Sequence, residues 1–133
     1  MKERKEIPVR QVMRQEVTEV DGSIDVMEAM RIMKRVETTS LIVRKRNEQD
    51  EYGMVLFSDI AKQVIAKDRA PERVNVFEIM AKPVIAVRPD MSIRHCARLF
   101  EEFNISHAPV LENDQVIGII SYYLLVLGGL DLD

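Results

Sequence analysis

The chain has 133 residues, of which 47% are hydrophobic, and its 22 acidic and 19 basic residues give a net charge of −3 at pH 7. This length and composition suit one compact domain or two small fused halves with a buried core. The mixed charge argues against general nucleic-acid binding, which needs a basic surface.

The sequence carries no signal for export or for a membrane span. Cys96 is the single cysteine, so the chain has no internal disulfide framework, which fits a reducing compartment. Residues 1–10 are charged and no apolar segment follows them, as a secretory signal would require. The longest apolar stretch, residues 116–130, is too short to cross a bilayer as a helix. We therefore expect a cytoplasmic protein.

The second half of the chain repeats the apolar pattern of the first. "VRQVM" (9–13) aligns with "VFEIM" (76–80), "VTEV" (17–20) with "VIAV" (84–87), and "TTSLIV" (38–43) with "ISHAPV" (105–110). The offset of 67 falls to 65 at Gly53 and Gly118, since the first copy has two extra residues in its polar stretch 44–52. Two copies of this length indicate an internal duplication and not a solenoid, which needs more repeats.

Taken in chain order, each copy is predicted to be β-α-β-β-α, which makes the fold class α+β. Apolar residues at i, i+3, i+4 and i+7 predict helices over 24–36 and 91–103, which Ser23 and Asp90 are placed to cap. Shorter helices are expected over 58–67 and 121–127. The predicted strands are 17–20, 40–43, 52–57, 84–87, 108–111 and 115–121. The first repeat then covers 1–67, a charged linker with Pro71 covers 68–75, and the second repeat covers 76–133.

No catalytic or metal motif emerges from the sequence. His95 and Cys96 are adjacent, and neighbours on a helix point about 100° apart, so they do not form a dyad. Two histidines and one cysteine make a poor zinc site, and the five glycines form no phosphate loop. The methionines at 27, 30 and 33 are typical of a core or a dimer face. We expect a protein that is not an enzyme.

These paired phrases resemble the cystathionine β-synthase (CBS) domain, of which two in tandem form a Bateman module. The resemblance rests on "VRQVM…VTEV" and "VFEIMAKPVIAV", on "NISHAPV", and on "GMVLFSDI" (53–60) and "GIISYYLL" (118–125). It implies two repeats packed about a pseudo-twofold axis with two clefts between them, and usually a homodimer. It also implies a regulatory module that senses an adenosine compound such as AMP, ADP, ATP, S-adenosylmethionine or NAD, and that acts on a partner protein still to be identified.

The family's ribose-binding phrase is similar to Gly-apolar-apolar-Thr/Ser-x-x-Asp, and each repeat keeps half of it. The first has Asp59 but Leu56 in the hydroxyl position, and the second has Ser121 but Leu124 in the acidic position. An aspartate can accept hydrogen bonds from both ribose hydroxyls, so the resemblance implies that the Asp59 cleft binds the nucleotide and the other binds weakly or not at all. Asp59 could also cap its helix, and the two roles are compatible.

The other expected ligand contacts follow the resemblance more loosely. The base is expected near the first strand and the entrance to the second, and phosphates need cations or N–H donors. Glu19 and Ala86 stand where the family often has Thr, which departs from its usual pattern. The expected contacts are Val17, Thr18, Thr39, Ser40 and Lys62, then Val84, Ile85, Ser106, His107 and Pro109, with Lys82 and Arg98 as further cations.

A second hypothesis remains open. Both ribose phrases are incomplete, so Leu56 and Leu124 could fill the clefts. The chain would then be a ligand-free scaffold that dimerises or docks onto a partner protein.

Overall fold

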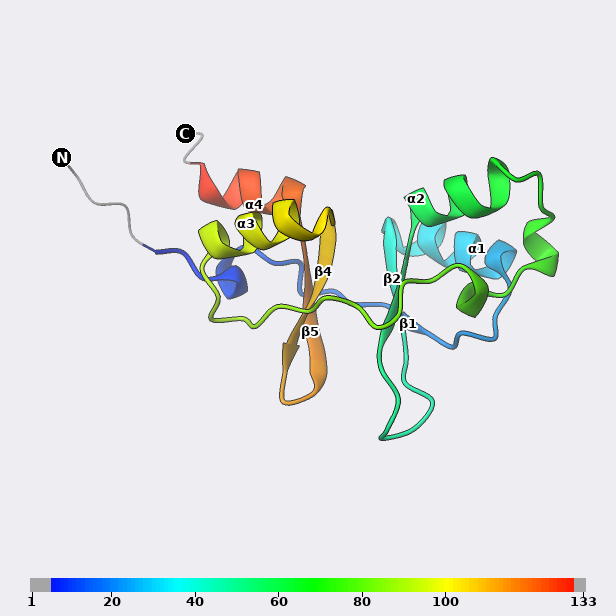
Figure 1. Cartoon of the computed structure of the whole chain (residues 1–133), viewed down its shortest axis with the longest axis horizontal. Helices are drawn as coiled ribbons and strands as arrows, with labels where there is room; N and C mark the ends of the chain where they lie inside the picture. The colour runs from blue at the N-terminus through cyan, green and yellow to red at the C-terminus, as the bar shows by residue number, and fades with distance from the viewer. Residues whose placement is uncertain (1–5, 131–133) are drawn as a thin grey trace. The chain divides into compact units, whose positions relative to one another are not determined.

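The computed structural model describes residues 6–130, which form two compact units (Figure 1). One unit is the continuous segment Thr18–Val84, and the other combines the residues up to Val17 with those from Ile85 onward. Each unit has its own hydrophobic core. The α+β class predicted from the sequence is confirmed.

The Thr18–Val84 unit is built on a three-stranded sheet in the order β1-β2-β3. Strand β1 (Glu19–Val20) runs parallel to β2 (Ser40–Val43), and β3 (Gly53–Leu56) is antiparallel to β2. Helix α1 (Val26–Val36) connects the two parallel strands, as such a crossover requires. The register places Ser40 opposite Leu56, so the start of β2 and the end of β3 lie together.

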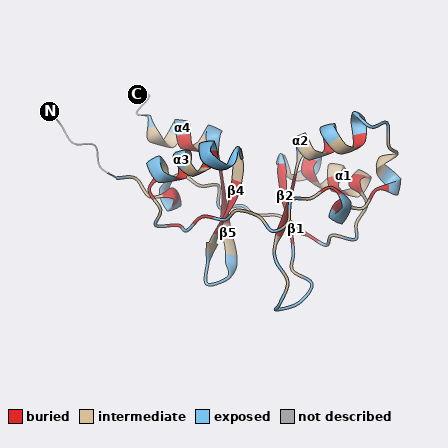
Figure 2. Ribbon diagram, viewed as in Figure 1, coloured by how far each residue is buried: buried red, intermediate tan, exposed pale blue. Residues whose placement is uncertain are grey.

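Both helices of this unit pack on one face of its sheet. Helix α2 (Phe57–Ile60) continues into a π-helical turn, Ala61–Ile65, and short 3-10 helices follow at Pro71–Arg73 and Val76–Glu78. Figure 2 shows the buried positions between helices and strands. Alternate strand residues meet the helices in this core, which contains Val20, Leu41, Val43, Val55, Ala29, Met33, Ile60 and Val64.

The second unit has a two-stranded antiparallel sheet, β4 (His107–Glu112) with β5 (Gln115–Ser121). Asn113 and Asp114 form its two-residue turn with φ of 52° and 62°, the left-handed conformation that such hairpins favour. Helices α3 (Ile93–Phe103) and α4 (Tyr122–Gly129) cover the sheet, and a 3-10 helix lies at Val9–Gln11. The core residues are Val9, Val87, Cys96, Phe100, Ala108, Val110, Ile120 and Leu125.

The segment that precedes each repeat packs against the other repeat. We call residues 6–17 the first lead-in and residues 76–84 the second. Val9 N donates to Met91 O at 2.8 Å, and the corresponding Val76 N donates to Ile24 O at 2.9 Å. The pairing of Arg14 with Ile119 likewise matches that of Ala81 with Met54. The two lead-ins are thus exchanged between the repeats.

The glycines of the two repeated phrases make room for these lead-ins. A Cβ on Gly53 would lie 2.6 Å from Met80 Sδ, and one on Gly118 would lie 2.5 Å from Met13 Sδ. Met13 and Met80 are themselves corresponding positions of the two lead-ins. Each phrase therefore begins with glycine because a methionine of the exchanged segment lies directly over it.

Several predicted boundaries are wrong. The strand expected over 17–20 contains only Glu19–Val20, and the strand expected over 84–87 is reduced to one bridge between Val87 and Val110. The division at 1–67, 68–75 and 76–133 stays a prediction, and packing crosses it through the lead-ins.

The two helix caps were also predicted at the wrong residues. Asp25 and Ser92 cap α1 and α3, in place of Ser23 and Asp90. Ser23 instead donates from its N and Oγ to Asp21 Oδ1, at 2.8 and 2.7 Å, and these bonds lower the pKa of Asp21.

Candidate functional site

Asp59 lies in the first turn of α2 and faces back toward the end of β3. Its Oδ2 accepts a hydrogen bond from Leu56 N at 2.8 Å. Its Oδ1 has no hydrogen bond with another described residue, and the side chain is half-buried. Asp59 therefore caps its helix with one oxygen and leaves the other available to a ligand.

Ser121 holds the corresponding place before α4, where it is the N-cap residue. Its Oγ accepts a hydrogen bond from Leu124 N at 3.3 Å. In repeat order Ser121 matches Leu56, and Leu124 matches Asp59. The second repeat thus caps its helix with the hydroxyl of Ser121. It has Leu124 at the position where the first repeat has the carboxylate of Asp59.

These two arrangements are the two halves of one capping box. In that motif an N-cap hydroxyl accepts from the third helical N–H, and an acidic or amide side chain at that third position accepts from the N-cap N–H. The first repeat keeps the acid of Asp59, and the second keeps the hydroxyl of Ser121. Each helix start therefore keeps one capping hydrogen bond, although each ribose-binding phrase is incomplete.

The structure brings Thr39, Ser40 and Leu56 together beside Asp59. Thr39 O accepts from Phe57 N at 3.0 Å, which joins the entrance of β2 to the start of α2. Ser40 is buried. Its backbone N donates to Thr38 Oγ1 at 3.3 Å, and Thr38 Oγ1 donates to Ser40 O at 3.1 Å. Thr38 was not among the predicted site residues, although a hydroxyl two residues before a strand is a recognised turn signal.

The second unit brings Ser106, His107 and Ser121 together in the corresponding place. Ser106 Oγ lies 2.8 Å from His107 Nδ1, and His107 is directly opposite Ser121 in the β4–β5 register. Ser106 O accepts from Tyr122 N at 3.3 Å, as Thr39 O does from Phe57 N. Pro109 is buried, and its carbonyl accepts from Val87 N at 3.0 Å.

Five other predicted ligand contacts form no hydrogen bond, within the described residues, to the groups beside Asp59 or Ser121. They are Val17, Thr18, Lys62, Val84 and Ile85. Thr18 is half-buried and gives its carbonyl to Ile42 N at 2.9 Å. Val17, Val84 and Ile85 are half-buried, and Lys62 is exposed three residues beyond Asp59.

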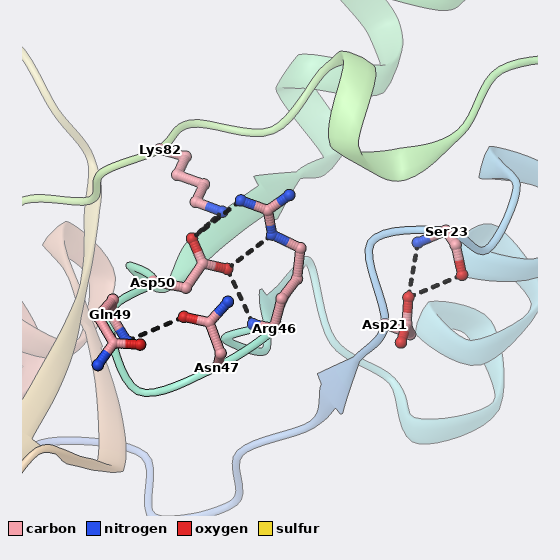
Figure 3. A network of polar contacts seen from close by, with 7 residues as sticks. All are labelled: Asp21, Ser23, Arg46, Asn47, Gln49, Asp50 and Lys82. Atoms are coloured by element: carbon pink, nitrogen blue, oxygen red, sulfur yellow. Dashed lines mark hydrogen bonds and ion pairs between the residues drawn. The ribbon is translucent and has the colours of Figure 1, made fainter.

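Of the further cations, Lys82 is engaged elsewhere, in a network around Asp50 (Figure 3). Its Nζ lies 2.6 Å from Asp50 Oδ1, and Arg46 Nε lies 3.1 Å from Asp50 Oδ2. The Arg46 side chain and then Lys82 hold the pKa of the Asp50 carboxyl well below its usual range. Lys82 therefore ties the second lead-in to the 44–52 loop, and its contact with a phosphate stays a prediction. Arg98 is exposed on α3.

The described residues offer little to other kinds of site. They contain no cluster of three groups that could hold a metal ion. None of their helices is both long and apolar enough to cross a membrane. A cavity of about 490 Å³ in the second unit is lined by residues such as Arg10, Glu112 and Asp114, and contains none of the predicted ligand contacts.

Comparison with known proteins gives one consistent family. The sequence profile of the CBS domain matches residues 9–66 and again residues 76–126. These two matches cover most of the chain and correspond to its two repeats.

Two solved structures are similar over nearly the whole chain. The hexameric CBS-CP12 protein from bloom-forming cyanobacteria is 38% identical, with a TM-score of 0.88 over 90% of this chain and 69% of that one. The CBS domain pair of protein MJ0100, in complex with 5′-methylthioadenosine and S-adenosyl-L-methionine, is 25% identical, with a TM-score of 0.79 over 94% of this chain and 98% of that one.

Similar sequences also occur inside longer proteins. A homoserine O-acetyltransferase of Methanosalsum zhilinae is 38% identical over 115 residues, which are 86% of this chain and 22% of that protein. A second one, from Methanohalobium evestigatum, is 32% identical and is likewise covered over 22% of its length. The chain thus spans about a fifth of these relatives, so their activity does not transfer with the match.

Proposed function

Because the chain belongs to the CBS domain family and carries two copies of that domain, we propose that it is a regulatory module that binds an adenosine-containing compound. The proposal assigns it no reaction of its own. The similar MJ0100 domain pair binds two such compounds, 5′-methylthioadenosine and S-adenosyl-L-methionine. AMP, ADP and ATP share the adenine and ribose of these ligands and are candidates for the same role.

The observation that carries this proposal is that only one carboxylate oxygen of Asp59 is hydrogen-bonded to another described residue. Its Oδ2 is bound by Leu56 N, and its Oδ1 is available to a donor. A ribose presents two adjacent hydroxyls, and hydrogen bonds to a carboxylate are about twice as strong as those between neutral groups. Leu124 offers no such acceptor in the second repeat. We therefore assign the ribose to the first repeat and expect weak or no binding at the second.

The remaining predicted contacts have supporting roles in this proposal. Main-chain groups near Thr18, Thr39 and Ser40 would meet the base, and Lys62 would meet a phosphate where the ligand has one. His107, beside Ser106, would be the corresponding contact for a phosphate at the second repeat.

Thermal melting against a panel of ligands tests the proposal. The panel holds AMP, ADP, ATP, 5′-methylthioadenosine, S-adenosylmethionine and NAD, with buffer as the reference. A ligand present at a hundred times its Kd adds about 2.7 kcal/mol to the free energy of unfolding. In a chain of this size we expect a rise of several degrees in Tm.

Two matched variants separate ligand binding from helix capping. Asp59→Ala and Ser121→Ala each remove one capping hydrogen bond, which costs about 1 kcal/mol of stability in either case. Only Asp59→Ala also removes the ribose acceptor. We expect the ligand-induced rise in Tm to survive in Ser121→Ala and to be lost in Asp59→Ala. An equal rise in both variants would sink the site assignment.

If no adenosine compound shifts the melting temperature, the ligand-free scaffold becomes the better account of the chain. We further propose a homodimer and a cytoplasmic location. The dimer is supported by the exposed apolar residues of α4.

A further inference from the structure

The two exchanged lead-ins are bound to their sheets by corresponding main-chain hydrogen bonds. Arg14 N donates to Ile119 O and Ile119 N donates to Arg14 O, both at 2.9 Å. In the Thr18–Val84 unit, Ala81 N donates to Met54 O at 2.9 Å and Met54 N donates to Ala81 O at 3.0 Å. These bonds alone therefore give neither lead-in an advantage.

The residue that follows these bonds differs between the two lead-ins. Gln15 follows Arg14 and is exposed, and it forms no hydrogen bond or ion pair with another residue of the described range 6–130. Lys82 follows Ala81, and its Nζ lies 2.6 Å from Asp50 Oδ1 (Figure 3). At this position the second lead-in thus has an ion pair to the hairpin of its sheet, and the first lead-in has none among the described residues.

The carboxylate that meets Lys82 comes from the longer of the two hairpin loops. The 44–52 loop lies between β2 and β3, and it is two residues longer than the segment 111–117 at the corresponding place of the second repeat. This longer loop brings Asp50 to the second lead-in. The unequal lengths of the two loops are therefore connected with the unequal anchoring of the two lead-ins.

Asp50 is held in place by its own loop. Arg46 donates to Asp50 Oδ2 from its main-chain N at 2.8 Å and from its Nε at 3.1 Å, while Arg46 Nη2 is farther away, 3.5 Å from Oδ1. Asp50 N donates to Asn47 O at 3.1 Å, and Gln49 N donates to Asn47 Oδ1 at 2.9 Å. The Asp50 side chain is only 6% exposed. The loop thus presents Oδ1 to Lys82 in a fixed position, which lowers the entropy lost when the ion pair forms.

Protonation does not open this ion pair near neutral pH. The Arg46 side chain and then Lys82 hold the pKa of the Asp50 carboxyl well below its usual range. A carboxyl whose pKa is lowered by folding contributes stability above its ordinary pKa and loses that contribution only as the pH falls below it. The ion pair is therefore present across the neutral range.

We propose that Asp50 and Lys82 form a latch that keeps the end of the second lead-in bound while the corresponding end of the first lead-in opens. Each lead-in ends where the chain passes from one compact unit to the other, after Val17 and after Val84. The latch anchors the second of these passages only. Local opening then takes place first at residues 13–17, which supplies the second conformational state that a regulatory response requires.

Hydrogen exchange measured by NMR tests the latch within one molecule. The amides of Ala81 and Met54, which we call the latched pair, report on the second lead-in, and the amides of Arg14 and Ile119, the unlatched pair, report on the first. After correction for intrinsic rates, we expect the unlatched pair to exchange at least about fivefold faster. Equal rates in the two pairs, or slower exchange in the unlatched pair, would overturn the proposal.

Two single variants separate the latch from the closure of the loop. Lys82→Met removes the ion pair and keeps the bonds between Arg46 and Asp50. We expect it to speed exchange of the latched pair at least about fivefold and to leave the unlatched pair unchanged. Arg46→Met should have a smaller effect. Lys34→Met, which replaces an exposed lysine on α1 of the same unit, is the matched control and should change neither pair.

Uniform acceleration of both pairs in Lys82→Met would indicate a general loss of stability and contradict the latch. A double variant adds an independent test, because two residues that act through one contact have non-additive effects. Asp50→Asn combined with Lys82→Met should speed exchange of the latched pair no more than Asp50→Asn alone, and additive effects would overturn the proposal. All these measurements are made without ligand, so their outcome does not depend on adenosine binding.

Discussion

Asp59 and Ser121 each show how a single side chain can serve the fold and remain available for function. Asp59 holds Leu56 N with one oxygen, and Ser121 holds Leu124 N with its hydroxyl. The sequence predicted both as ligand contacts and offered capping as the alternative for Asp59. The capping bonds are present, and ligand binding by either residue stays a prediction. Which oxygen of Asp59 is engaged depends on the local backbone and could not follow from composition or spacing.

Gly53 and Gly118 differ in how far they tolerate a side chain. A Cβ at Gly118 would lie 2.5 Å from Met13 Sδ and 2.9 Å from Arg14 O, which is backbone and cannot move cheaply. At Gly53 the nearest backbone atom, Ala81 O, is 3.3 Å away, and only the flexible end of Met80 is closer. We expect Gly118→Ala to lower the free energy of unfolding by about 1–3 kcal/mol and Gly53→Ala by less than about 1 kcal/mol. Urea denaturation measures both.

Shortening the methionine separates the two causes of that loss. Met13→Ala combined with Gly118→Ala should recover little, because Arg14 O still blocks the new Cβ. Equal losses in the two single glycine variants would show that the main-chain approach is not what matters.

At the level of elements, the helices were the best predicted part of the chain. The expected helices over 24–36 and 91–103 contain the observed Val26–Val36 and Ile93–Phe103, because a strong 3.6-residue apolar pattern reports packing directly. The strand expected over 84–87 had the same apolar character as 17–20, yet only Val87 finds a ladder partner. A segment forms a strand only where a neighbouring strand can pair with it. The valine and isoleucine of residues 84–87 do not reveal whether such a neighbour is present.

The cap of α3 gives a sharp test at this level. Ser92 Oγ accepts from His95 N at 3.2 Å, whereas Asp90 forms only an exposed ion pair with Arg88 at 3.4 Å. We expect Ser92→Ala to cost about 1 kcal/mol in the free energy of unfolding and Asp90→Ala to cost less than about 0.5 kcal/mol. Thermal melting at pH 7 compares the two variants. A larger loss of stability in Asp90→Ala would show that Asp90, the residue predicted from the sequence, caps α3.

For the whole molecule, the exchange of lead-ins matters more than the duplication itself. Internal similarity predicted two repeats in sequence order, and the family match supports two domains. The compact units nevertheless group the first lead-in with the second repeat and place the second lead-in in the Thr18–Val84 unit. Val76 and Ile79 belong to the core of the first repeat. Sequence similarity could not show this, because aligned segments look alike whichever repeat they pack against.

Two fragments of equal length test this organisation. Residues 18–84 contain a complete core with its lead-in, whereas residues 1–67 lack Val74, Val76 and Ile79 and carry a lead-in with no strand to pair with. We expect the 18–84 fragment to unfold cooperatively in urea and the 1–67 fragment to unfold gradually, with a lower helix signal in circular dichroism. Greater cooperativity in 1–67 would contradict the exchange.

The exchanged lead-ins also set an order of events during synthesis on the ribosome. All parts of the Thr18–Val84 unit have been translated once Val84 is made, so that unit can fold while the rest of the chain is still being translated. The first lead-in is made before that unit, yet Ile119, the bridge partner of Arg14, comes more than a hundred residues later. The contacts of Met13 and Arg14 with β5 therefore cannot form until β5 has left the exit tunnel. The first lead-in thus precedes the Thr18–Val84 unit in the chain and is enclosed after it.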